Sequence, residues 1–166
     1  MAGILILGIG NVLMSDDGAG VHLARLLASQ LAGRPDVRVE DGGTLSFSLA
    51  PLIEEVTRLI VLDAMQLRAP PGTVRRFLDG EVDAVLGRAR LSVHEIGLRD
   101  VLQLVRLAGR CPQELALIGI QPAELGWGTT PGAGVSAALP AAGRLALELL
   151  DEWPGARAPL PRRTAA

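Results

Sequence analysis

Four side chains that can bind a metal ion or move protons stand out in the sequence, and three of them are carboxylates. Asp16 and Asp17 lie near the end of the glycine-rich stretch GIGNVLMSDDGAG, residues 8–20, and Asp63 follows the apolar run LIVL. His94 adds an imidazole in the segment LSVHEIG. Two carboxylates and one imidazole suit nickel, zinc or a similar divalent ion and leave coordination positions open. The pattern favours a metal-engaging site, with Asp16 and Asp17 as alternatives for the first carboxylate.

Nucleotide and phosphoryl sites fit the same stretch less well. The dinucleotide-binding pattern G-x-G-x-x-G fails because Leu13 stands where the third glycine is required. A phosphoryl-accepting receiver domain would use an acidic pair and an aspartate such as Asp63, but it normally also needs a lysine, and the chain contains none. A P-loop is excluded because no GK[ST] sequence is present.

Familiar hydrolase motifs are also incomplete. His94 and Glu95 begin like the zinc motif H-E-x-x-H, but Leu98 occupies the fifth position. No G-x-S-x-G nucleophile elbow occurs. Cys111 precedes Pro112, and no neighbouring residue in the sequence would activate its thiol, so we expect it to be structural. A serine or cysteine nucleophile is therefore not indicated.

Each candidate also has a purely structural interpretation. Asp17 can serve as a helix N-cap, and Asp16 as a cap or turn residue. His94 can simply bind a backbone carbonyl from a loop, and His22 fits an exposed helix surface. Asp63 is different, because a lone carboxylate at the end of an apolar strand is costly to bury unless it is paired, hydrogen-bonded or bound to a metal.

The elements that must position these residues alternate between strand and helix patterns. Short apolar runs predict strands at Ile4–Leu7, Val37–Val39, Arg58–Leu62, Thr73–Phe77 and Leu115–Ile120. Helical spacing of apolar residues predicts helices within 21–31, 48–56, 96–105 and 139–150, with a turn at 68–72 and a long loop at 122–134. We therefore expect one α/β domain over residues 1–153, with a twisted, mostly parallel sheet and helices on both faces, and a flexible tail over residues 154–166.

The carboxyl ends of the strands are where such a sheet usually binds ligands. If the first and third strands are neighbours, their ends lie about 5 Å apart, and the acidic pair and Asp63 can face one cleft. The segment DGGT, which comprises Asp41, Gly42, Gly43 and Thr44, follows the second strand toward the same edge. Gly8 and Gly10 are expected to serve the tight turn after the first strand.

Composition excludes several classes of partner. The net charge is -2 and aromatic residues make up 2% of the chain, which disfavours a nucleic-acid partner. The apolar runs are only of strand length, so no membrane insertion is expected. The first residues, MAGILILGIG, lack the pattern of a signal peptide, which favours a cytoplasmic protein. The single cysteine excludes an internal disulfide.

Five segments together resemble one known family. They are GIGNVLMSDDGAGV, DGGT, LIVLDA, SVHEIGL and GIQP, and their order and spacing are similar to those of the hydrogenase maturation endopeptidases. These enzymes trim the C-terminus of the large subunit of nickel-iron hydrogenases. The likeness extends from Ile4 to about Leu150, and although each motif alone is weak, five in register are specific.

The resemblance implies a function, a partner and a set of site residues. The function is endopeptidase removal of the C-terminal extension of a nickel-loaded hydrogenase large-subunit precursor. The site is an acid, aspartate and histidine triad that engages nickel; it is carried over to Asp17, Asp63 and His94, with the DGGT segment contacting substrate. The nickel is supplied in the substrate, and another divalent ion is an acceptable substitute. The alternative is a non-catalytic nickel-binding or chaperone module, because no activated nucleophile is evident.

Overall fold

The computed structural model describes residues 3–44, 47–87, 93–123 and 125–153. The predicted tail, residues 154–166, lies outside the described residues. The strands are β1 (Ile4–Ile9), β2 (Val37–Gly43), β3 (Arg58–Ala64), β4 (Val74–Leu78) and β5 (Glu114–Ile120). The α-helices are α1 (Ala19–Gln30), α2 (Ala50–Glu54), α3 (Gly80–Leu86), α4 (Val93–Leu107) and α5 (Ala133–Glu152), and two short 3-10 helices are η1 (Ser15–Gly18) and η2 (Phe47–Leu49).

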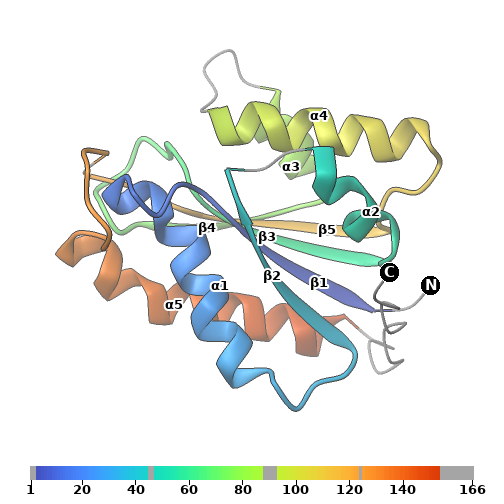
Figure 1. Cartoon of the computed structure of the whole chain (residues 1–166), viewed down its shortest axis with the longest axis horizontal. Coiled ribbons are helices and arrows are strands. Elements are labelled where there is room, and N and C mark those ends of the chain that lie inside the picture. Colours follow the sequence, from blue (N-terminus) through green and yellow to red (C-terminus); the bar gives the residue numbers. More distant parts are fainter. Residues whose placement is uncertain (1–2, 45–46, 88–92, 124, 154–166) are drawn as a thin grey trace.

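The strands form one twisted sheet in the order β2-β1-β3-β5-β4 (Figure 1). Strand β1 pairs in parallel with β2 and β3, strand β3 pairs in parallel with β5, and only β4 runs antiparallel to its neighbour. The first and third strands are therefore neighbours, which is the condition under which the acidic pair and Asp63 can lie near each other. Their carboxyl ends lie side by side at one edge of the sheet, which is the edge that carries the candidate residues.

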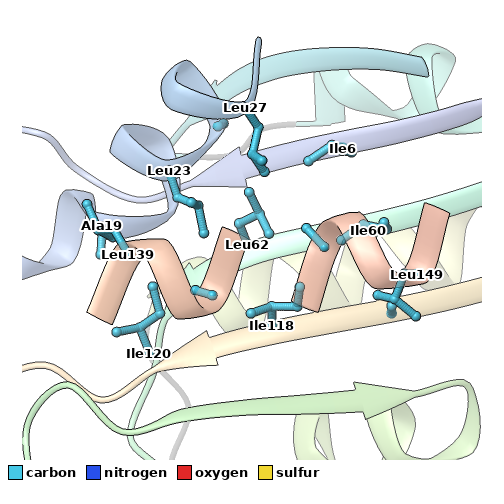
Figure 2. Close-up of a cluster of buried hydrophobic side chains, with 14 of the residues drawn as sticks. Ile6, Ala19, Leu23, Leu27, Ile60, Leu62, Ile118, Ile120, Leu139 and Leu149 are labelled. Atoms are coloured by element: carbon cyan, nitrogen blue, oxygen red, sulfur yellow. The ribbon is translucent and has the colours of Figure 1, made fainter. Parts of the chain in front are cut away.

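Side chains that alternate along the strands build two cores, one on each face of the sheet. Figure 2 shows the first core, in which Leu23 of α1 and Leu149 of α5 lie beside Ile6, Leu62 and Ile118 of the sheet. The second core lies on the opposite face, beneath helices α2, α3 and α4. Because both faces are covered, the central strands consist mainly of apolar residues, as is typical of a parallel sheet, and Asp63 of β3 is an exception. The predicted α/β architecture with helices on both faces is confirmed.

Several element boundaries differ from the sequence prediction. Strand β2 continues to Gly43, four residues beyond the predicted end, because Glu40 and Asp41 still pair with β1. The predicted helix over 48–56 divides into η2 and the short helix α2, with Pro51 in its first turn. Helix α3 was not predicted, since its seven residues are too few for a clear helical period.

Helix α5 corrects one expectation about apolar segments. By length and composition alone it could cross a membrane, with a mean hydropathy of 1.3 over an 18-residue window. The sequence pattern hid this because Pro140 and Arg144 interrupt the apolar run. Its side chains Ala142, Ala146 and Leu149 are fully buried against the sheet, so the apolar face of α5 belongs to the core.

Candidate functional site

The turn after β1 brings an aspartate back toward the end of the sheet. Gly10 has a φ of +134°, and its N–H donates to the carbonyl of Gly43 at 2.7 Å. A Cβ atom at position 10 would lie 1.9 Å from the Asp17 carbonyl oxygen, so only glycine fits this approach. The Asn11 N–H then donates to Oδ2 of Asp17 at 3.1 Å. This turn fixes both the backbone and the carboxylate of Asp17.

Asp17 forms a short contact with His94. The distance between Nε2 of His94 and Oδ2 of Asp17 is 2.7 Å, and both side chains are largely buried. His94 is the second residue of α4, so the sequence expectation of a loop histidine just before the helix placed the helix start too late. The paired residues are 77 positions apart and come from opposite sides of the sheet edge. Asp16 does not join the pair, because its oxygens accept hydrogen bonds from Ala123 and Gly132.

The two members of the pair shift each other's pKa. Burial tends to raise the pKa of Asp17, but the hydrogen bond to His94, the charge of His94 and the Asn11 N–H outweigh it, so the net pKa is lowered. The pKa of His94 is raised, mainly by the Asp17 hydrogen bond, which exceeds the opposing effect of burial. Each shift favours the charged form of its group. The pair is therefore stabilised as a carboxylate and an imidazolium.

Asp63 is the most unusual polar group at this edge. It is the penultimate residue of β3, its exposed fraction is 0%, and neither carboxylate oxygen has a hydrogen-bond partner among the residues that the structure describes. Burial raises the pKa of Asp63 well above its ordinary value, and the charges of Glu95 and Asp17 raise it further. A buried carboxyl without a partner favours either a bound proton or an arriving cation.

The geometry of a preformed metal centre is not present in the described parts of the chain. No group of three or more His, Cys, Asp or Glu side chains within them is arranged to hold a metal ion. Asp17 and His94 instead form a hydrogen bond with each other. Asp63 lies close enough to Asp17 for the charge of Asp17 to raise the pKa of Asp63. The donor types still fit a divalent ion, since both Asp63 oxygens are buried without a hydrogen-bond partner among the described residues.

The DGGT segment contacts the site through backbone groups of Gly43 and Thr44 and not through the Asp41 side chain. Asp41 is bound to Arg25 at 2.8 Å and accepts the Gly43 N–H at 3.0 Å, so its carboxylate is committed elsewhere. Asp41 to Gly43 are the last residues of β2, whereas the sequence placed them beyond the strand. The backbone of Thr44, in contrast, contributes to the raised pKa of His94, which places it beside the ring.

A cavity of about 240 Å³ opens onto the pair and is lined by Met14, Asp17, Val93, His94 and Leu125. The three apolar lining residues were not predictable from the sequence. Val93 is 78% exposed and Leu125 is 54% exposed, so both present apolar surface to solvent next to the site. A single apolar residue in a loop has no periodicity from which its contacts can be predicted. Only its nearness in the sequence to a charged motif indicated that it could lie beside the site.

Two other expectations about polar residues need correction. His22 was assigned to an exposed helix surface, but its Nε2 atom is buried and has no hydrogen-bond partner among the described residues. Burial lowers the pKa of His22. Glu95 was considered only as part of an incomplete zinc motif, yet it is buried and lies close enough to raise the pKa of Asp63. The burial of both residues results from tertiary packing, which cannot be predicted from the spacing of residues in the sequence.

Replacing Asp17 with asparagine should lower the pKa of His94. Without the carboxylate the largest contribution that opposes burial is lost, and only the Thr44 backbone and the charge of Glu95 still raise the pKa, which should therefore fall toward the ordinary value of about 6.5. The measurement is an NMR titration of the His94 ring protons, with His22 as internal control, because Asp17 does not contribute to the pKa shift of His22. An unchanged His94 pKa would show that the pair is not formed in solution.

The same variant should change the pH dependence of stability with a definite sign. The lowered pKa of Asp17 gives stability that is present above its unfolded value and lost as pH falls through its folded pKa. The raised pKa of His94 gives stability that is present below its unfolded value and lost as pH rises through its folded pKa. The stability difference between wild type and Asp17→Asn should therefore be largest between about pH 4 and 6.5.

Comparison with known proteins identifies the family. Residues 21–149 match the family described as "Hydrogenase maturation protease". The chain is 43% identical over 122 residues to hydrogenase expression/formation protein HupD of Rhodobacter capsulatus, covering 74% of this chain and 58% of that relative's length. It is also 43% identical to HoxM of Azotobacter vinelandii, over 90% of this chain and 72% of that protein.

The fold is similar to that of a solved structure of a hydrogenase maturating endopeptidase. The hydrogenase maturating endopeptidase HybD from Escherichia coli superposes with a TM-score of 0.81 and 32% sequence identity, over 90% of this chain and 93% of the HybD chain. The family match covers more than half of this chain, and the structural match covers nearly all of it. The chain therefore belongs to the hydrogenase maturation protease family, a family of endopeptidases.

Proposed function

We propose that this chain is an endopeptidase that removes the C-terminal extension from a nickel-loaded precursor of a hydrogenase large subunit. The observation that supports the proposal is the contact between Asp17 and His94 beside the buried Asp63, whose pKa the charge of Asp17 raises, in a chain of this family. The proposed substrate is a protein chain, so the partner is the hydrogenase precursor rather than a nucleic acid. A cytoplasmic location is part of the same proposal.

Nickel enters this proposal as a feature of the substrate. Two carboxylates and one imidazole match the ligand preferences of nickel, and another divalent ion of similar preference could substitute. Asp63 supports this role because its buried oxygens have no partner among the described residues and would gain most from an arriving cation. For the nickel to bind, the hydrogen bond between Asp17 and His94 would have to break, which exposes the ring nitrogen and the carboxylate. The metal-binding arrangement would therefore form only when the substrate binds.

Water is the proposed nucleophile for peptide-bond cleavage. The hydroxyl of Ser15 donates to the Gly126 carbonyl, and Cys111 packs beside the apolar core under α4, so neither is placed as an attacking group. A metal ion held in the substrate can polarise the scissile carbonyl or the attacking water. The raised pKa of His94 favours its protonated form, so the ring could donate a proton to the leaving amine.

The direct test is cleavage of a purified precursor. We expect the purified chain to shorten a nickel-loaded large-subunit precursor by one C-terminal peptide, detected by intact-mass spectrometry. The matched control is the same precursor with the extension already deleted, whose mass should not change. Failure to shorten the loaded precursor would contradict the proposed activity.

A non-catalytic nickel-binding or chaperone module is the second candidate, and the lack of a placed protein nucleophile favours it. In that case cells lacking this protein should remain unable to mature their hydrogenase even when the large-subunit gene already lacks the extension. Restoration of hydrogenase activity by the shortened gene would instead support the endopeptidase, because cleavage would then be the only step that was missing.

A further inference from the structure

A loop far away in the sequence is fastened to the turn that carries Asp17. We call this segment, residues 123 and 125–132, the clamped loop. The Ser15 N–H donates to the Gly128 carbonyl at 2.8 Å, and the Gly128 N–H donates to the Leu13 carbonyl at 3.0 Å. The Ser15 hydroxyl also donates to the Gly126 carbonyl at 2.9 Å. A Cβ at position 128 would lie 2.4 Å from the Ser15 hydroxyl oxygen, so a larger residue there would displace the Ser15 hydroxyl from its bond to Gly126.

Asp16 holds both ends of the clamped loop. Its Oδ2 accepts the Ala123 N–H at 2.7 Å and its Oδ1 accepts the Gly132 N–H at 2.6 Å. The side chain is fully buried, with an exposed fraction of 0%. Charge-assisted bonds of this length are among the stronger hydrogen bonds in proteins. Asp16 therefore has a structural role that differs from the role of Asp17. It joins the two ends of a loop, which are nine residues apart in the chain.

The clamped loop supplies one wall of the cavity at the site. Leu125 lines that cavity together with Met14 and Val93, and the same cavity contains Asp17 and His94. Trp127, in the same loop, is 86% exposed. The cavity is thus apolar where the loop and the start of α4 meet it, and charged at the Asp17 and His94 end. An apolar group matches the Met14, Val93 and Leu125 walls of this cavity, and a group bound there lies next to Asp17 and His94.

We infer that Asp16 is a positioning residue that holds Leu125 in place, so that the cavity accepts an apolar side chain of the precursor next to the peptide bond to be cleaved. This inference rests on the proposed endopeptidase function. The occupant is a side chain of the precursor, because the proposed function brings the scissile peptide bond to Asp17 and His94, which line the same cavity as Leu125 and Val93. Leu125 and Val93 then select the side chain, and Asp16 keeps one of these walls from moving away.

The first test separates positioning from general stability. In Asp16→Asn one loop N–H faces an amide NH₂ instead of an oxygen, so one end of the loop is released. We expect KM for the nickel-loaded precursor to rise about tenfold with kcat nearly unchanged, since uniform binding is lost. The matched control is Asp36→Asn, another buried aspartate, which binds Arg34 and lies just before β2 at the opposite edge of the sheet. It should lower stability and leave KM unchanged.

The second test does not depend on whether Asp16→Asn folds. Leu125→Ala removes exposed apolar surface, so stability should be kept while KM rises about tenfold. A wild-type KM in Leu125→Ala would overturn the inference, as would an equal KM increase in Asp16→Asn and Asp36→Asn.

Fluorescence distinguishes failure of this inference from failure of the proposed function. In a Trp153→Phe background the anisotropy of Trp127 reports loop order, and Asp16→Asn should lower it. If wild type does not cleave the precursor, the proposed function fails, and the inferred subsite fails with it. If wild type cleaves but Asp16→Asn changes neither anisotropy nor KM, only the inference fails.

Discussion

Replacing Asp63 with asparagine is expected to lower precursor cleavage by about 100-fold or more while making the folded chain more stable at neutral pH. The loss of activity follows because asparagine keeps the size of the side chain but removes the charge that would engage a cation. The gain in stability follows because the wild-type carboxyl is fully buried without a hydrogen-bond partner among the described residues. An opposite effect on activity and stability is typical of a functional group held in a strained environment.

The pH dependence of this stability gain has a clear sign. The folded-state pKa of Asp63 is raised, so the native state retains a proton that the unfolded state has lost. Stability of the wild type therefore falls as pH rises from the unfolded value, about 4, to the folded value. The Asp63→Asn variant lacks this penalty, so its advantage should be largest at high pH and should vanish below about pH 4. Glu95 and Asp17 are the acidic groups that contribute to the shift.

Thermal unfolding of both proteins across this pH range, combined with cleavage rates, measures the two effects. The matched control is Asp100→Asn, which alters a partly exposed carboxylate on α4 and should change neither property by much. A variant that loses stability at pH 8 would show that Asp63 has a stabilising partner in the native state. A variant that cleaves at the wild-type rate would remove Asp63 from the reaction.

Replacing Gly10 with alanine should damage both the fold and the site. The backbone at position 10 has a φ of +134°, which alanine adopts only with strain, and the new Cβ would lie 1.9 Å from the Asp17 carbonyl oxygen. Strain and the steric clash together should cost roughly 2–4 kcal/mol of unfolding free energy. Because the clash falls on Asp17 itself, its contact with His94 should be broken and cleavage should be lost.

Urea unfolding and the precursor assay test this prediction, and Gly33→Ala is the matched control. Nothing lies within 4 Å of a Cβ at position 33, so that change should be nearly neutral in both measurements. If Gly10→Ala were as active as Gly33→Ala, the turn after β1 would not be what fixes Asp17. The His94 pKa in Gly10→Ala offers a further check, since loss of the pair should lower it.

The sheet was predictable because its signals are local. Fully buried parallel strands read as continuous apolar runs, and β1, β3 and β5 have that composition. The adjacency of β1 and β3 then brings Asp63 toward the acidic pair through topology alone. Helix α3 was missed because a short helix lacks a measurable period, and its burial depends on packing with α4 and the sheet.

The division of labour between Asp16 and Asp17 was not predictable from the motif. The side chains of the two adjacent acids in the 3-10 turn point in different directions. Each forms hydrogen bonds with groups that are more than 70 residues away in the sequence. Asp17 meets His94 from α4, whereas Asp16 meets the N–H groups of Ala123 and Gly132. The family resemblance placed Asp17 in the triad, and the geometry gives the neighbouring acid a role of its own.

The most direct test of the central claim is the nickel dependence of cleavage. Nickel-loaded and nickel-free forms of one precursor, at equal concentration, are incubated with the purified chain, and the rate of C-terminal peptide release is measured by mass spectrometry. The proposed site predicts rapid release from the loaded form and none from the nickel-free form, and release from the loaded form should be about 100-fold slower or more in Asp63→Asn. Equal release from the two forms would contradict the claim that Asp17, Asp63 and His94 engage nickel in the substrate.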